Sequence, residues 1–243
     1  MHRGVRLKVT KNGENSYALT DWYIENLHGQ TFWVFDLECT GGNVEAARVM
    51  QFGAVRVERG RPVPGSEFTR LVNPGQPIRP FIAELTGITD EQVKDAASLP
   101  EVFAEFTQRG AGCVWAAHSA FEFDLPMLLA ECRRHGLPFP DVPVMDNRAL
   151  HTYLHPDRAG VFGTAYQLAH FGIEVGTRQR HDALGDALLA ADIFCANLKL
   201  CRERGVHHIQ VGDEALTVQY GHLPEAAPTL EWTLPTPISR SGS

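Results

Sequence analysis

The sequence has no run of about 18 apolar residues, no C-x-x-C pair and no excess of positive charge. The first absence, with no apolar block of signal-peptide length near the N-terminus, predicts a cytoplasmic protein with no membrane partner. Five cysteines, an odd number, argue against a zinc site and against a disulfide framework. A net charge of −7 weighs against a generic phosphate-binding surface, but remains compatible with a nucleic-acid enzyme whose acids hold metal ions.

The 243 residues are long enough for one large α/β domain with extensions. We expect an N-terminal extension at 1–31, a central domain at 32–204 and a C-terminal tail at 205–243. The opening MHRGVRLKVTK has four basic residues and no acid, so it could hold a nucleic-acid strand or simply be solvated. The tail has four prolines and weak periodicity, and we expect it to wrap around the domain or to dangle.

Within the central domain, strands come first and helices follow between and after them. The segments predicted as strands are TFWVFDLE, VMQFGAVRVERG, SEFTRLVNPG, GCVWAAH and VPVMDN. Helices are predicted from Asp124 to Gly136, across TAYQLAHFG, and from about 182 to 203. This order predicts a mixed α/β sandwich.

Two acids, Asp36 and Glu38, stand two residues apart in the otherwise apolar segment TFWVFDLECTGG. Successive side chains of a strand point to opposite faces, so these two share one face. Like charges that share a half-buried face repel each other and lose solvation. The pair therefore needs bulk water, a shared proton or a cation, and by itself it could equally be a solvated strand end.

Three further polar residues occur where the predicted elements meet. Asp124 lies between a buried strand and a helix, Asp186 lies one turn inside an apolar helix, and His181 precedes that helix. Acids at helix starts and at a central strand end can converge at one edge of a sheet. A site with only oxygen ligands suits Mg²⁺ or Mn²⁺ rather than zinc.

These residues also fall into three ordered motifs: D-x-E in FDLECTG, His118 followed by Asp124, and H-x-A-x-x-D in HDALGD. The motifs and the LTGIT segment at 85–89 resemble those of the DEDDh 3′–5′ exonucleases, which include proofreading subunits, RNase T, oligoribonuclease and the three-prime repair exonucleases. The resemblance covers roughly residues 32–203. It implies an RNase H-like fold with a mixed sheet of five strands flanked by helices.

The resemblance also implies a two-metal hydrolysis of phosphodiester bonds at the 3′ ends of single-stranded DNA or RNA, with release of nucleoside 5′-monophosphates. Asp36 would bridge two Mg²⁺ (or Mn²⁺) ions, Glu38 and Asp186 would complete the tighter site, and Asp124 would hold the second ion partly through water. His181 would be the general base, a role that suits an imidazole because its ordinary pKa is about 6.5.

For the substrate, the resemblance implies contacts that surround these acids. The terminal base would lie against apolar residues near Leu37 and Ile88, and the backbone at 39–42 would contact the last sugar. The implied contacts beyond the acids are Leu37, Cys39, Thr40, Gly41, Ile88, His118 and Ser119. DNA is favoured; an exoribonuclease of the RNase T or oligoribonuclease type and a catalytically silent binding module remain alternatives. A polymerase or repair partner and the oligomeric state are left open.

The sequence departs from the family pattern around the second motif. Ser119 replaces the asparagine that many members have after the histidine, and Asp124 comes sixth after His118 where many members place it fifth. This longer spacing is similar to that of the repair exonucleases and is the reason for favouring DNA. Glu122, two residues before Asp124, is a rival ligand.

Several of these residues also have ordinary structural interpretations. Asp124 is a favoured helix N-cap, and Asp186 could face solvent beside Asp182, four residues earlier, with mild repulsion. We interpret Asp146 as a strand-end turn residue. The histidines of HPD at 155–157 and of 207–208 show no ligand spacing and are interpreted as structural or solvent-facing.

Overall fold

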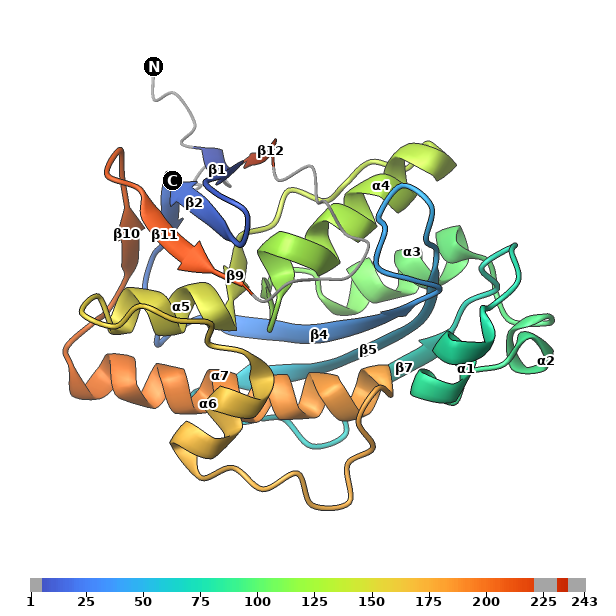
Figure 1. Cartoon of the computed structure of the whole chain (residues 1–243). Helices are drawn as coiled ribbons and strands as arrows, with labels where there is room; N and C mark the ends of the chain where they lie inside the picture. Colours follow the sequence, from blue (N-terminus) through green and yellow to red (C-terminus); the bar gives the residue numbers. More distant parts are fainter. Residues whose placement is uncertain (1–5, 221–230, 236–243) are drawn as a thin grey trace, which may run out of the picture.

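The computed structural model describes residues 6–220 and 231–235. Its centre is a mixed sheet in the order β6-β5-β4-β8-β9, with β7 also paired to β5 (Figure 1). The strands are β4 (Thr31–Cys39), β5 (Val49–Glu58), β6 (Arg61–Pro62), β7 (Phe68–Leu71), β8 (Val114–Ala117) and β9 (Val144–Asp146). Since β6 and β7 share one edge of β5, the sheet is five strands wide, which confirms the predicted RNase H-like α/β class.

Strand directions explain why the sheet is mixed. β4 runs antiparallel to β5 along its whole length and parallel to β8, and β8 is in turn parallel to β9. The β4–β5 pair is a local hairpin closed by the loop at 40–48, whereas the parallel pairs need helical crossovers. Asp36 and Glu38 lie near the C-terminal end of the central strand β4. This end of the sheet also holds the β4–β5 loop and the start of the connection that follows β8.

Helices cover both faces of the sheet. They are α1 (Pro80–Thr86), α2 (Asp90–Val93), α3 (Leu99–Arg109), α4 (Leu125–His135), α5 (Asn147–Leu154), α6 (Thr164–Phe171) and α7 (Ala183–Glu203), with a π-helical turn η1 (Ala120–Asp124) before α4. On β4, Phe35 packs edge-on against Phe106 of α3, and Phe32 packs against Phe194 of α7. Even-numbered residues of β4 therefore face α7, and odd-numbered residues face α3.

The two predicted extensions pair with each other. A four-stranded sheet has the order β11-β2-β1-β12, and a second sheet pairs β10 with β3. These strands are β1 (Arg6–Lys11), β2 (Ser16–Thr20), β3 (Trp22–Ile24), β10 (Ile209–Val211), β11 (Leu216–Gln219) and β12 (Glu231–Pro235). Trp22 is buried, and its indole N–H donates to the Val144 carbonyl at 3.0 Å. The described parts of the segments before 32 and after 204 thus pack against the core of the central domain, although the predicted boundaries themselves stay untested.

All five cysteines are unbonded thiols. Among the helices of the described residues, none combines the length and the apolar character needed to cross a bilayer.

Candidate active site

Asp36 and Glu38 lie on the face of β4 that is turned toward α7. They share this face with Phe32, whose ring lies 4.7 Å from that of Phe194 on α7, centroid to centroid. Glu38 is only 9% exposed, so it is not a solvated strand end. In the β4–β5 register Asp36 lies opposite Gly53, which leaves the space over this part of the sheet to the start of α7.

The start of α7 brings Asp186 and His181 to the acids of β4. One ligand atom each of Glu38, His181 and Asp186 lies within 4.8 Å of the other two. The backbone N–H of His181 donates to Asp186 Oδ2 at 3.0 Å. His181 has a φ of 59°, in the left-handed region that few non-glycine residues adopt. This turn brings the imidazole to the carboxylates while the helix holds Asp186.

Asp182 fixes where α7 begins, a role the sequence analysis did not foresee. Its Oδ2 accepts from the Gly185 N–H at 3.0 Å, as a helix N-cap does. Gln51 of β5 donates from Nε2 to Asp182 Oδ1 at 2.8 Å, and the Ala183 N–H donates to Gln51 Oε1 at 3.0 Å. These two bonds tie the first turn of α7 to the sheet beside the acids.

Asp124 ends the π-helical turn η1. The Asp124 N–H donates to the Ser119 carbonyl at 3.4 Å, and the Leu125 N–H donates to the Ala120 carbonyl, both five residues back. A π turn holds one residue more than an α turn, which explains why Asp124 comes sixth after His118. Asp124 is buried and lines the same cleft as Asp36, whose pKa its charge raises, so the turn brings this acid to the acids of β4.

Glu122, the rival ligand, pairs with a cation inside the protein. It forms a buried ion pair with Arg148, which also donates from Nη2 to Ser119 Oγ at 3.2 Å. Asp146 supports the same turn by accepting from the Phe121 N–H at 3.2 Å while it caps α5. Glu122 therefore holds η1 in place, and Asp124 is the acid of this segment that forms no ion pair with any residue the structure describes.

Burial raises the pKa of each of these carboxyl groups, and neighbouring negative charges raise it further. Burial raises the pKa of Asp36 well above its usual value, and the charges of Asp124, Glu38 and Asp186 raise it further. Burial, with Asp186, Asp124 and Asp182, raises the pKa of Glu38 to about 8. Burial and Glu122 raise the pKa of Asp124 to about 7. The protein alone therefore cannot keep all these groups ionised at neutral pH, and cations placed among them would.

Arg180 is a site residue that the sequence analysis missed. Its Nε lies 2.9 Å from Asp186 Oδ1, and its charge lowers the pKa values of Asp36 and Glu38. The available signal was its place directly before His181 in the run RQRHD. It offsets part of the negative charge and lines the cleft.

These side chains line a cleft of about 540 Å³. Of the implied substrate contacts, the residues that line it are Leu37, Cys39, Gly41, His118 and Ser119. Both ring nitrogens of His118 lack a hydrogen-bond partner within the described residues, and burial lowers its pKa well below the ordinary value, so the ring is neutral.

Thr40 and Ile88 lie elsewhere. Thr40 Oγ1 accepts from the Arg48 N–H at 3.0 Å and from Gln76 Nε2 at 2.6 Å, so its side chain belongs to the β4–β5 loop. Ile88 is buried in a separate apolar cluster that includes Met50 of β5 and Ile82 of α1. Ile82 and Leu85 of α1 line the cleft where Ile88 was expected.

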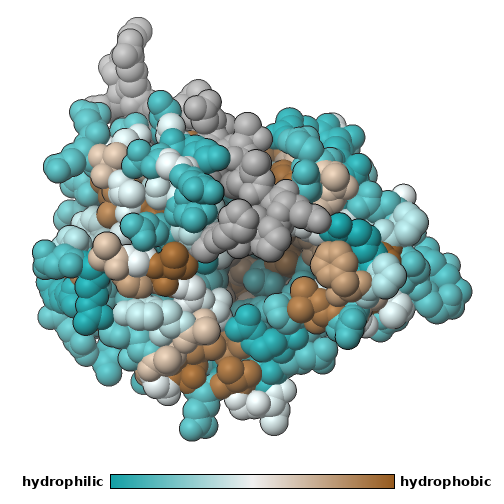
Figure 2. Space-filling model, viewed as in Figure 1, coloured by the Kyte–Doolittle hydropathy of each residue, from teal (hydrophilic) through white to brown (hydrophobic). Residues whose placement is uncertain are grey.

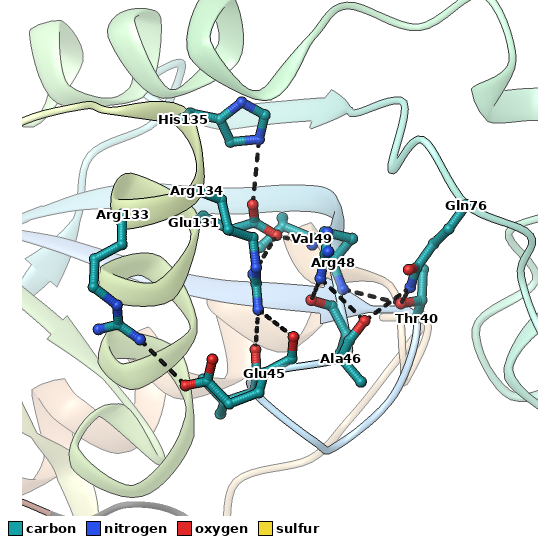
Figure 3. A network of polar contacts seen from close by, with 12 residues as sticks. Thr40, Glu45, Ala46, Arg48, Val49, Gln76, Glu131, Arg133, Arg134 and His135 are labelled. Carbon is teal, nitrogen blue, oxygen red and sulfur yellow. Dashed lines mark hydrogen bonds and ion pairs between the residues drawn. The ribbon is translucent and has the colours of Figure 1, made fainter.

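A polar network fixes the β4–β5 loop that carries Gly41 and Gly42 (Figure 3). Buried Glu131 of α4 accepts from the Val49 N–H at 3.2 Å and lies 3.2 Å from Arg134 Nη1. Arg134 donates to the Glu45 carbonyl at 2.9 Å, and Arg133 pairs with the Glu45 carboxylate at 3.2 Å. Charge-assisted bonds of this kind hold the cleft wall against α4.

The donor set fits hard divalent cations. Asp36, Glu38, Asp124 and Asp186 offer only carboxylate oxygens at the core of the cleft, which is the ligand chemistry of Mg²⁺ and Mn²⁺. Burial and the neighbouring acids raise the pKa values of Asp36 and Glu38, and Arg180 lowers them. The four acids line one cleft and are thus placed to hold cations, and the imidazole of His181 lies beside Glu38 and Asp186.

Comparison with known proteins agrees with this geometry. A family model described as Exonuclease (RNase_T) matches residues 33–194. A DNA polymerase III subunit epsilon-like protein of Rhodobacter capsulatus is 36% identical over 206 residues, which are 81% of this chain and 27% of that protein. A DNA polymerase III PolC-type of Lactococcus lactis is 32% identical over 74% of this chain and 11% of its own length. The chain thus spans only about a quarter or less of these relatives.

Solved structures show the same fold. The nuclease domain of 3′hExo, described as a DEDDh family member bound to rAMP, has a TM-score of 0.63 at 17% identity, over 76% of this chain and 98% of that one. A full-length 3′-exonuclease has a TM-score of 0.62 at 16% identity, over 88% of this chain and 76% of that one. With the family model covering most of the chain and the acids converging in one cleft, the chain belongs to the RNase_T exonuclease family.

Proposed function

We propose that this chain is a divalent-metal-dependent 3′–5′ exonuclease that removes nucleoside 5′-monophosphates from the 3′ end of single-stranded DNA. The observation that carries the proposal is the convergence of Asp36, Glu38, Asp124 and Asp186 with His181 in one cleft. Family membership and the sequence motifs point to the same chemistry.

The residues would divide the work as follows. Asp36, at the centre of the group, would ligate both of two Mg²⁺ ions; Glu38 and Asp186 would complete one ion's ligands and Asp124 the other's. When bound, such a pair of ions stabilises the negative charge on the attacking and leaving oxygens of an in-line displacement. His181 would take the proton of the attacking water at its imidazole nitrogen, since the left-handed turn holds that ring beside Glu38 and Asp186.

Substrate would enter with its terminal base against the apolar side of the cleft. Leu37, Ile82 and Leu85 line that side, and Leu85 is 49% exposed. Gly41 and Gly42 leave backbone free to approach the last sugar. On the face drawn in Figure 2, hydrophobic side chains gather over α1 and over α6, beside a hollow in the surface. These surfaces would hold a base by stacking and burial without selecting its identity.

A DNA substrate is supported by the spacing of the second motif and by the relatives named for DNA polymerase III. Those relatives also suggest a polymerase as a partner for this chain. An exoribonuclease of the RNase T or oligoribonuclease type is the second candidate, because the 2′-hydroxyl contacts that separate the two are not fixed by the motifs.

The test uses one oligonucleotide sequence as DNA and as RNA, each labelled at its 5′ end and incubated with the full chain and Mg²⁺. We expect a ladder of DNA products that shorten by one nucleotide at a time, with slower shortening of the RNA. EDTA should stop both reactions. Internal cleavage, shortening from the 5′ end or full activity in EDTA would refute the proposal, and faster RNA degradation would select the exoribonuclease.

A further inference from the structure

Three histidines that are not part of the acidic site gather where α5, α6 and α7 meet. One ring nitrogen each of His151, His155 and His170 lies within 4.8 Å of the other two. His151 is on α5, His155 is the residue that ends this helix, and His170 is on α6. The sequence interpretation of 155–157 overlooked that His151 and His155 are four residues apart, the spacing that puts two side chains on one helix face.

A chain of amide hydrogen bonds fixes the tautomer of His151. Gln167 Nε2 donates to the Phe162 carbonyl at 2.9 Å, so its Oε1 faces Asn197 and accepts from Asn197 Nδ2 at 2.9 Å. Asn197 Oδ1 then faces His151 Nδ1 at 3.1 Å and accepts a hydrogen bond from its N–H. His151 Nε2 is therefore an unprotonated acceptor. It is completely buried and has no hydrogen-bond partner within the described residues.

His155 is held in the same tautomer. Its Nδ1 lies 2.9 Å from the His151 carbonyl, which can only accept, so Nδ1 carries the proton and Nε2 carries the lone pair. The ring centroids of His151 and His155 are 4.2 Å apart. Burial lowers the pKa values of both rings, to about 4 for His151, so they are neutral at pH 7. Metal-ligating histidines have this arrangement, with one nitrogen donating to an oxygen and the other free.

His170 supplies the third imidazole from another helix. It is exposed, its centroid lies 5.1 Å from that of His151, and its ring stacks on Tyr166. Three nitrogens around a tetrahedral zinc ion with bonds of about 2.0–2.1 Å would lie about 3.4 Å apart. The cluster would have to close by about an ångström, which the exposed His170 side chain allows.

We propose that His151, His155 and His170 form a second metal site, for a zinc-class ion and not for Mg²⁺. Imidazole nitrogen suits Zn²⁺, Co²⁺ and Ni²⁺, whereas Mg²⁺ prefers oxygen ligands. The absence of paired cysteines does not bear on a site made only of imidazoles. Two cations oppose the ion. Arg204 Nη2 lies 3.5 Å from His155 Nε2, a long contact that the ion would displace. The charge of Arg158 lowers the pKa values of His151 and His155.

The ion would act on the cleft wall. The segment between α5 and α6 carries Phe162, whose ring lies 4.8 Å from that of His151, and its neighbour Val161 lines the cleft, as does Thr164 at the start of α6. An ion that joins α5 to α6 would therefore hold this wall in place. Its role would be structural, separate from the hydrolytic chemistry.

The test is calorimetric titration of Zn²⁺ into the full chain with Asp36→Asn and Asp186→Asn, in excess Mg²⁺, so that the acidic residues do not compete. We expect one Zn²⁺ per chain, with affinity lowered at least tenfold by adding His170→Gln or His155→Gln. His208→Gln, at an exposed histidine outside the cluster, is the matched control and should leave binding unchanged. Zn²⁺ should also raise the Tm of the Asp36→Asn, Asp186→Asn chain but not of the same chain with His170→Gln added.

His151 is not substituted because its ring is part of the core. An absence of zinc binding, or binding that neither His155→Gln nor His170→Gln weakens, would overturn the proposal. X-ray absorption that shows only oxygen neighbours around the bound zinc would do the same.

Discussion

Gly53 on β5 lies opposite Asp36 and directly against the first turn of α7: a β-carbon at residue 53 would come within 2.0 Å of the Ala183 carbonyl carbon. No real side chain tolerates such a contact with backbone. The glycine is thus what lets α7 approach the sheet closely enough for Asp186 to reach the acids of β4. Gln51, two residues earlier, supplies the hydrogen bonds at the same junction.

Gly53→Ala is expected to push the start of α7 away from β5. Overpacking of this kind costs about 1–3 kcal/mol of stability. Displacing a catalytic group by about 1 Å lowers turnover about 10²-fold. Urea unfolding and exonuclease rates measure the two effects. Gly212→Ala is the control, because residue 212 has open space and no positive φ, and its activity should equal wild type. Wild-type activity in Gly53→Ala would show that this close approach does not position Asp186.

His181 is best tested with asparagine, which tolerates the left-handed backbone that residue 181 adopts. His181→Asn should lower kcat about 10²–10⁴-fold, the usual contribution of a general base, while KM changes little. His208→Asn serves as the control for loss of an imidazole. A kcat within a few-fold of wild type would remove His181 from the role of base.

Substitution of Glu122 is expected to lower stability, whereas substitution of Asp124 is expected to abolish activity without lowering stability. Glu122→Gln leaves Arg148 buried without its anionic partner, which costs about 3–5 kcal/mol of stability. Asp124→Asn removes a carboxylate that repels its neighbours, so the metal-free protein should become no less stable while Mg²⁺-dependent activity is lost. Thermal unfolding in EDTA measures the change in stability of each variant, and exonuclease rates in Mg²⁺ measure the change in its activity. Activity that survives Asp124→Asn but not a folded Glu122→Gln would make Glu122 the ligand.

The stability of the metal-free protein is expected to fall as pH rises. Folding raises the pKa of Asp124 from 3.8 to about 7 and that of Glu38 from 4.5 to about 8, so the folded state binds protons more tightly than the unfolded state. The stability that this tighter proton binding adds to the folded state is complete below a pH of about 4. It is lost as the pH rises through about 7 to 8. Melting temperatures in EDTA across this range should decline, and saturating Mg²⁺ should reduce the decline. A melting temperature that does not change with pH in EDTA would contradict the raised pKa values of Asp124 and Glu38.

Local sequence patterns were enough to predict much of the fold and the acids. The segments TFWVFDLE and VMQFGAVRVERG predicted β4 and β5, and Gly136 predicted the end of α4; each is present. The residues Asp36, Glu38, Asp124, Asp186 and His181 line one cleft. Their roles as ligands and base stay predictions until metal and substrate are measured.

Features that depend on distant partners could not be predicted. The π turn before Asp124 is held by Asp146, 25 residues away from Phe121, so no local pattern marks it. The pairing of β2 with β11 joins residues about two hundred positions apart. Ile88 lies in the LTGIT segment, but its side chain turns into a cluster with Met50, and only packing decides that.

The central claim, that the four carboxylates hold a pair of ions, is tested most directly by anomalous diffraction from crystals grown with Mn²⁺ and a deoxynucleoside 5′-monophosphate. We expect two manganese peaks about 3.5–4 Å apart, with Asp36 ligating both. Asp124 should lie at one ion and Asp186 at the other. A single peak, or peaks that Asp124 or Asp186 does not approach, would contradict the account.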